Sequence, residues 1–141
     1  MSDIKRVMAF DFGSKRIGIA FGQSLTQTAQ VVGEIPARDG IPNWQDIEAI
    51  IQEWQPDQLL TGLPLNMDGT ENLMCARARK FARRLHARFN LPSYMWDERL
   101  SSAHAKSIQP SSNYKLHAVD AIAACSILES WFYNDSPEQL A

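Results

Sequence analysis

Three acidic residues lie in sequence surroundings where a negative charge needs an explanation. Asp11 interrupts the apolar run 7–12, and Asp120 is the single formally charged residue of the segment 116–128. A carboxylate in an apolar setting costs free energy unless hydrogen bonds or a cation compensate it. A structural ion pair would explain either residue, and capping would explain Asp120 if a helix began near Val119. Metal binding is the functional alternative, and both are candidate ligands.

The third acidic residue, Glu98, stands beside Asp97 at the end of a strand-like segment, 93–97. Neighbouring side chains of a regular strand point to opposite faces. Only one of the two carboxylates is therefore expected to enter a common site, and the other to orient Arg99 or to cap the following helix. Either Asp97 or Glu98 is thus a candidate ligand, with a solvated strand end as the alternative.

Carboxylates are preferred ligands of hard divalent cations. Such cations promote the hydrolysis of phosphodiesters. Two Mg²⁺ or Mn²⁺ ions can activate a water molecule and stabilise both the charge added to phosphorus and the leaving oxygen. In this hypothesis Asp11, Asp120 and one of the two carboxylates at the strand end hold the ions. No Ser-His-Asp or Cys-His arrangement in the sequence predicts a nucleophile supplied by the protein.

Cationic residues gather in the segment 77–88, which contains no Asp or Glu. A solvated helix surface is one interpretation. The clustering and the excess of arginine, which binds phosphate through paired hydrogen bonds, favour a track for a nucleic-acid backbone. The residues expected to bind nucleic acid are Arg77, Lys80, Arg84 and Arg88 of this segment, together with Lys15 and Arg99 beside the candidate ligands.

The segment 62–69 joins a strand-like stretch to a helix and is rich in turn-forming residues. Exposed N–H groups at the start of the following helix would be able to receive a phosphate. A plain connecting loop is the alternative, and the segment is not a Walker motif.

Hydrophobic periodicity predicts three strands at the start of the chain, followed by alternating helices and strands. The strands are expected over 7–12, 17–21, 30–37, 58–62 and 93–97. The helices are expected over 44–54, from an N-cap at Thr70 to about Phe89, from Ser101 or Ser102 to about Ile108, and over 115–133. A polar loop is expected over 109–113, and a frayed tail over 134–137.

This order predicts the α/β class, with a mixed five-stranded sheet of three antiparallel and then two parallel strands, flanked by helices. It is the order of an RNase H-like fold. The 141 residues are expected to form a single domain with a core over about 5–133.

Composition is that of an ordinary globular protein, with 45% hydrophobic and 21% charged residues. No apolar run approaches the ~20 residues of a membrane span, and residues 1–6 lack the order of a secretory signal. We therefore expect a cytoplasmic protein without a membrane partner.

The net charge of −2 conceals the local cationic cluster. Cys75 and Cys125 are expected to be buried, reduced thiols.

Four segments together resemble the YqgF/RuvX family, in the family's order and spacing. They are 9–18 (AFDFGSKRIG), 62–69 (GLPLNMDG), 97–101 (DERLS) and 119–121 (VDA). The resemblance implies an RNase H-like fold related to the RuvC Holliday junction resolvases, and a role in maturation of the 5′ end of pre-16S rRNA. Motif by motif, the resemblance implies that Asp11, Glu98 and Asp120 are the metal ligands, which selects Glu98 over Asp97. Asp11 would then bridge the ions, while Glu98 and Asp120 would anchor one each.

The chain departs from the RuvC pattern at Ala123, where RuvC-type sites commonly carry a fourth acid three residues after the helical Asp. The loop before Asp120 is also poor in cations and offers Lys115 and His117, where relatives tend to be more basic. Substrate binding is therefore expected to rely on the cationic segment 77–88.

Three other functions compete with an RNA nuclease. A Holliday junction resolvase would act on branched DNA and would need a homodimer to cut two strands symmetrically, whereas an RNA nuclease could be a monomer. A non-catalytic RNA-binding or transcription-associated factor would use the cationic segment alone. The segment 11–14 (DFGS) also looks like the phosphate-binding start of sugar kinases and actin-like ATPases, but those need a second comparable domain.

Overall fold

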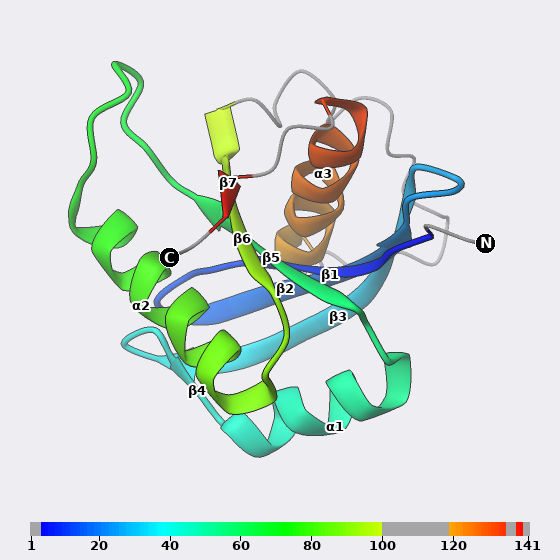
Figure 1. Ribbon diagram of the computed structural model, residues 1–141. Coiled ribbons are helices and arrows are strands. Elements are labelled where there is room, and N and C mark those ends of the chain that lie inside the picture. The colour runs from blue at the N-terminus through cyan, green and yellow to red at the C-terminus, as the bar shows by residue number, and fades with distance from the viewer. Residues whose placement is uncertain (1–3, 100–118, 135–137, 140–141) are drawn as a thin grey trace.

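The computed structural model describes residues 4–99, 119–134 and 138–139. A mixed β-sheet forms the centre, with helices on both faces (Figure 1). The strands are β1 (Arg6–Asp11), β2 (Arg16–Gln23), β3 (Thr28–Arg38), β4 (Ile41–Pro42), β5 (Gln58–Leu63), β6 (Ser93–Asp97) and β7 (Glu138–Gln139). The helices are α1 (Trp44–Trp54), α2 (Leu73–Phe89) and α3 (Val119–Asn134).

The sheet confirms the predicted order of antiparallel and then parallel strands. Its strand order is β4-β3-β2-β1-β5-β6-β7, in which β1, β2 and β3 are antiparallel while β5 pairs in parallel with β1 and β6. Within the described residues the sheet has seven strands instead of the predicted five. The two additional strands, β4 and β7, are two residues long and lie at the edges, so they leave no hydrophobic period in the sequence.

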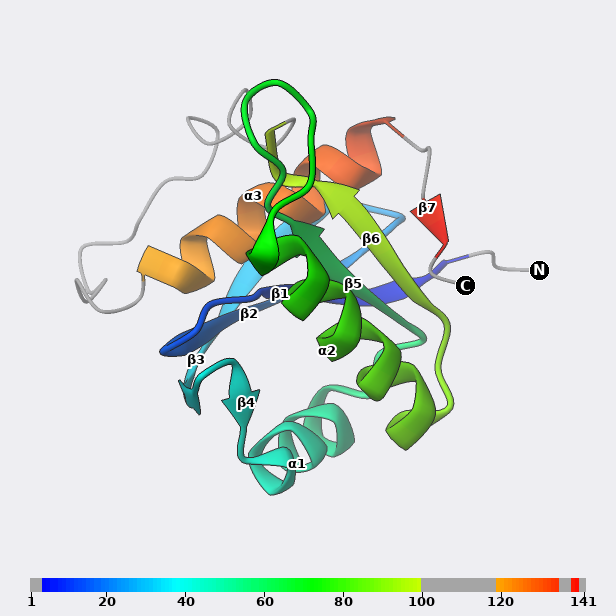
Figure 2. The same cartoon turned by 90° about the vertical axis from the view of Figure 1, so that its left-hand side faces the viewer.

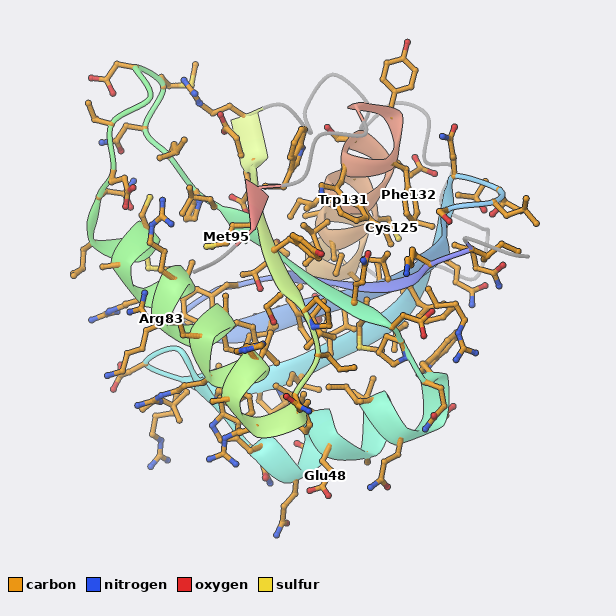
Figure 3. All side chains as sticks on the ribbon, viewed as in Figure 1. Glu48, Arg83, Met95, Cys125, Trp131 and Phe132 are labelled. Carbon is orange, nitrogen blue, oxygen red and sulfur yellow. The ribbon has the colours of Figure 1, made fainter. Side chains whose placement is uncertain are left out.

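Helices α1 and α2 pack on one face of the sheet, and α3 packs on the other (Figure 1). Side chains of β1 alternate between the two sides: Val7 and Ala9 face α3, while Met8 and Phe10 face α1 and α2. Both faces are therefore buried, which explains why β1 is almost continuously apolar. On the α3 side, Cys125, Trp131 and Phe132 lie between the helix and the sheet (Figure 3).

Helix α2 begins later than the sequence predicts. Asn72, and not Thr70, is the N-cap, and its side-chain oxygen accepts a hydrogen bond from the Cys75 backbone N–H at 3.0 Å. Thr70 is instead held in the preceding turn, where its N–H and hydroxyl both donate to Asp68 Oδ1. Two cap-forming residues lie close together here, and tertiary packing of Cys75 selects the later one.

An apolar stripe of α2 packs against the sheet. Ala78, Phe81, Ala82 and Leu85 are buried, and Phe81 meets Phe10 of β1 edge to face with ring centroids 5.5 Å apart. This packing fixes the helix on the sheet and turns the cationic residues of the helix toward the surface.

Cys75 and Cys125 are free and buried, as predicted. Burial, with a smaller effect of the Glu129 charge, raises the pKa of the Cys125 thiol to about 12. The helix expected over 101–108, the loop 109–113 and the start of the last helix at 115–118 lie outside the described residues, as does the tail 135–137. None of the helices that the structure describes is long and apolar enough to cross a membrane.

Candidate functional site

The structure brings Asp11 and Glu98 together at the carboxyl end of the parallel strands. Asp11 is the last residue of β1, and the alternation of that strand turns its side chain toward α3. Glu98 follows the last residue of β6, two strands away in the sheet. The two carboxyl groups share a hydrogen bond. An ionised carboxylate is only an acceptor, so this pair requires either a proton or a cation between the two groups.

The Glu98 carboxyl group has a raised pKa. Burial is the largest cause, since it removes water from the charged form, and the nearby negative charge of Asp97 adds to it. The hydrogen bond with Asp11 acts in the opposite direction but does not outweigh these effects. A raised pKa in a carboxylate pair at the end of parallel strands is a property of functional sites.

Gly62 in β5 makes room for the Glu98 side chain. A Cβ on Gly62 would lie 2.5 Å from Glu98 Oε1 and 2.6 Å from Ile127 Cδ1 of α3. Only a residue without a side chain therefore lets Glu98 occupy this position beneath the helix. Gly62 was expected to end the strand 58–62 and to begin the loop segment 62–69, and its role beside Glu98 was not predicted, although a glycine that ends an apolar strand is a signal for close approach.

We expect Gly62→Ala to reduce activity strongly while leaving the protein folded. The added methyl group meets the flexible ends of two side chains, so Glu98 would shift by about 1 Å and the sheet would persist. A displacement of that size in a reacting centre can cost about 100-fold in rate. Cleavage rate and thermal unfolding should be measured together, and an unchanged rate would contradict the placement of Glu98 in the site.

Asp97 points away from this pair and binds Arg99. The Arg99 guanidinium donates to both carboxylate oxygens of Asp97, with Nη2 2.7 Å from Oδ2, and its Nη1 donates to the Met67 carbonyl at 3.2 Å. Burial raises the pKa of Asp97. The hydrogen bonds from Arg99 and the Arg99 charge together lower it by more than burial raises it, so the net pKa of Asp97 is lowered. Asp97 thus orients Arg99, one of the two roles the sequence left open.

Arg99 consequently ties the end of β6 to the loop 64–72, which projects beyond the carboxyl ends of β5 and β6 (Figure 2). Its guanidinium is occupied by Asp97 and Met67, which favours a positioning role over the predicted phosphate contact. Within the loop, Asn72 donates to the Pro64 carbonyl and caps α2 with its oxygen. Because a side chain already satisfies the Cys75 N–H, the geometry favours a connecting loop over a phosphate-binding helix start.

Asp120 lies in the first turn of α3, and the direction of the helix places that turn at Asp11's end of β1. Leu128 and Phe132 lie against Gly22, which pairs with Val7 near the start of β1. The helix therefore runs antiparallel to β1. The start of α3 and the β1–β2 connection lie on the same side of the molecule, at the left of Figure 2. The Asp120 side chain is outside the described part of the structure.

The donor set of Asp11 and Glu98 fits a hard divalent cation. Two carboxyl groups that now share a hydrogen bond would both ionise if a cation took the place of the proton. Among the described residues, no group of three His, Cys, Asp or Glu side chains forms a complete metal site. A third ligand must then come from elsewhere, and Asp120 stays the predicted one.

The predicted nucleic-acid-binding residues of α2 lie in two different surroundings. Arg77, Lys80 and Arg84 line a surface hollow beside β4. Arg88 lies over the Trp44 ring, with its guanidinium carbon 4.5 Å from the ring centroid. Lys15 is exposed in the β1–β2 connection next to Asp11.

Comparisons with known proteins agree with this geometry. The family model described as "RuvX: Holliday junction resolvase" matches residues 5–134. A curated protein of Saccharophagus degradans is 54% identical over 135 residues, covering 93% of this chain and 95% of the relative. One of Haemophilus ducreyi is 56% identical over 133 residues, covering 92% and 96%. Both carry the name "Putative pre-16S rRNA nuclease".

The fold is shared with a solved structure of much lower sequence similarity. "T. thermophilus RuvC in complex with Holliday junction substrate" superposes with a TM-score of 0.59 at 11% identity, covering 96% of this chain and 99% of that chain. The likeness extends over nearly the whole of both chains and confirms the predicted RNase H-like architecture.

Proposed function

Because this chain belongs to the RuvX family, a family of nucleases with the RuvC fold, we propose that it is a divalent-metal-dependent endonuclease that matures the 5′ end of pre-16S rRNA in the cytoplasm. The observation that carries the proposal is the hydrogen-bonded pair of Asp11 and Glu98 at the carboxyl end of parallel strands. In this proposal Asp11, Glu98 and Asp120 hold two Mg²⁺ or Mn²⁺ ions.

When bound, the ions would supply an activated water molecule and positive charge for the phosphoryl and leaving oxygens. The chain contributes the arrangement of the ligands. Asp11 and Glu98 converge from two strands, and Gly62 allows Glu98 to lie between the sheet and α3. The partly buried setting strengthens the attraction of the carboxylates for a cation. The Asp97–Arg99 pair holds the loop 64–72 at the edge of the site.

Pre-16S rRNA is the favoured substrate because the curated relatives named above, which cover nearly the whole chain, carry that name. A second candidate substrate is a Holliday junction, favoured by the description of the family model and by the likeness to RuvC. Symmetric cleavage of a junction would require a homodimer, whereas cleavage of a single RNA site would not. Ala123 replaces the fourth acid of RuvC-type sites and favours the RNA substrate.

A direct comparison of substrates tests this proposal. Purified protein would be offered a labelled pre-16S rRNA leader, an unrelated linear RNA and a four-way DNA junction, each with Mg²⁺, Mn²⁺ or a chelator. We expect cleavage of the leader at a discrete position near the mature 5′ end, and none with the chelator. Symmetric cleavage of the junction alone would support the resolvase instead. Absence of cleavage of all three substrates would favour a non-catalytic RNA-binding protein.

A further inference from the structure

We propose that the hollow between α2 and the β3–β4 connection binds one unpaired base of a single-stranded nucleic acid, across the sheet from the carboxylate pair and at the same end of β1. The inference rests on the proposed function and adds to it a preference for single strands. The hollow is lined by Phe12, Asp39, Gly40, Ile41, Trp44, Arg77, Lys80, Phe81 and Arg84. We call it the α2 hollow.

The size of the α2 hollow suits one aromatic ring. Its volume is about 140 Å³, well below the ~300–1,000 Å³ of sites that enclose whole drug-sized ligands. An apolar cavity of about 150 Å³ is sufficient to hold benzene. A single base would fit, with its sugar and phosphate remaining at the rim.

The chemistry of the lining matches a nucleotide better than a bare anion. Phe12, Trp44 and Phe81 form an aromatic wall, in which the Trp44 and Phe81 rings are stacked with centroids 5.6 Å apart. Arg77, Lys80 and Arg84 supply positive charge for a phosphate, and none of the three forms an ion pair with any residue that the structure describes.

Asp39 is a further lining residue. Its carboxylate would repel a bare phosphate. It is also an acceptor for the amino group of a base. A lining that combines cations with one acceptor and an aromatic wall therefore selects an occupant with both an anionic and a hydrogen-bond-donating part, as a nucleotide has.

The position of the α2 hollow connects it to the carboxylate pair. Phe12 follows Asp11 directly, and the pleat of the chain turns Phe12 toward α2 while Asp11 faces α3. The hollow and the pair thus lie on opposite faces of the sheet at the same end of β1. A strand passing over the β1–β2 connection, where Lys15 is exposed, would reach both. A base in a continuous duplex would first have to leave its stack.

Neighbouring arginines of α2 provide a matched test. Arg84 lines the hollow, whereas Arg83 points outward from the helix (Figure 3). Binding of a labelled single-stranded RNA and of the same RNA in a duplex would be measured by fluorescence anisotropy, with a chelator present to prevent cleavage. We expect the wild-type protein to prefer the single strand, and Arg84→Ala to weaken single-strand binding about tenfold, which is within the range for loss of one bound base. Arg83→Ala should have a much smaller effect.

A second pair of variants tests the α2 hollow without changing Arg84. Ile41 lines the hollow and is 54% exposed, so Ile41→Glu would add a negative charge without disturbing the core. Leu25→Glu adds the same charge at a 69% exposed position in the β2–β3 turn, at the other end of β1. We expect Ile41→Glu to weaken single-strand binding and Leu25→Glu to leave it nearly unchanged. Inorganic phosphate at the same ionic strength should not compete.

The proposal would be overturned if Arg83→Ala and Arg84→Ala, or Ile41→Glu and Leu25→Glu, lowered single-strand affinity equally. That result would mean that α2 contacts the phosphates only through its general positive charge. Equal affinity of the wild type for single strand and duplex would overturn the proposal as well. Failure of the nuclease proposal would be distinguishable, because it would appear as absent metal-dependent cleavage while these binding differences persisted.

Discussion

Glu98→Gln is expected to reduce the metal-dependent cleavage rate by more than about 100-fold while the protein stays folded. Glutamine keeps the shape of the side chain but removes the charge that would hold a cation. Substitution of a residue that merely supports a metal ligand costs about 10–100-fold, so loss of a ligand should cost at least as much. Glu48→Gln is the matched control, because Glu48 is exposed on α1, remote from the site (Figure 3). Equal activity of the two variants would remove Glu98 from the site.

The same variant should be more stable than the parent at neutral pH when metal is absent. The folded protein holds the Glu98 proton to a higher pH than the unfolded chain does, since burial raises the pKa of Glu98. The folded state therefore binds more protons between the two pKa values, and stability falls as the pH rises through that window. Glutamine cannot ionise and avoids this loss. Thermal unfolding in a chelator, compared at acid and neutral pH, would measure the difference.

Metal binding should show the opposite trend with pH. A cation competes with the proton that Asp11 and Glu98 share, so metal affinity should rise as the pH increases through the raised pKa of Glu98. Cleavage at a subsaturating metal concentration should rise over the same range. A flat profile would indicate that both carboxylates are already ionised without metal.

Asp120→Asn is expected to reduce the metal-dependent cleavage rate to a similar extent as Glu98→Gln. The substitution keeps the side-chain shape and removes the single charge of the segment 116–128. Nucleic-acid binding should persist, because the cationic side chains of α2 are unchanged. Folding in the absence of metal should survive and stability should rise, since an uncompensated anion in an apolar setting costs free energy.

Two measurements, of cleavage and of unfolding, determine the role of Asp120 from this variant. Cleavage at the parental rate, with contaminating nuclease excluded by an Asp11→Asn preparation made in parallel, would show that Asp120 is not a ligand. Unfolding of Asp120→Asn without metal would point instead to a structural ion pair, and would favour the non-catalytic RNA-binding alternative.

Asp11 and Asp120 could be singled out as candidate ligands because their charges contradict their surroundings. An Asp inside an apolar strand or an otherwise uncharged helix is visible in the sequence without any knowledge of contacts. The pleat of a strand also predicted that Asp97 and Glu98 would separate, and the structure places Asp97 on Arg99 and Glu98 on Asp11. These inferences use local periodicity, which a single sequence contains.

Other features depended on competition between similar local signals. Thr70 and Asn72 are both suitable N-caps, and the packing of Cys75 in the core determined that α2 begins after Asn72. Strands β4 and β7 consist of two residues each and exist through pairing with a neighbouring strand. Nothing in such short segments distinguishes a strand from a turn.

The sequence by itself determined the order of the longer described elements and the surfaces that they bury, and it marked Asp11 and Asp120 as candidate ligands, because each of these follows from hydrophobic period and charge along the chain. Only the tertiary structure decided that Gly62 leaves space for Glu98, that Arg99 is occupied by Asp97, and that Arg77, Lys80 and Arg84 enclose a hollow with Phe12 and Trp44. These features join side chains from different strands and helices, and such distances are set by how the sheet and helices pack, a three-dimensional property that spacing along the chain does not contain.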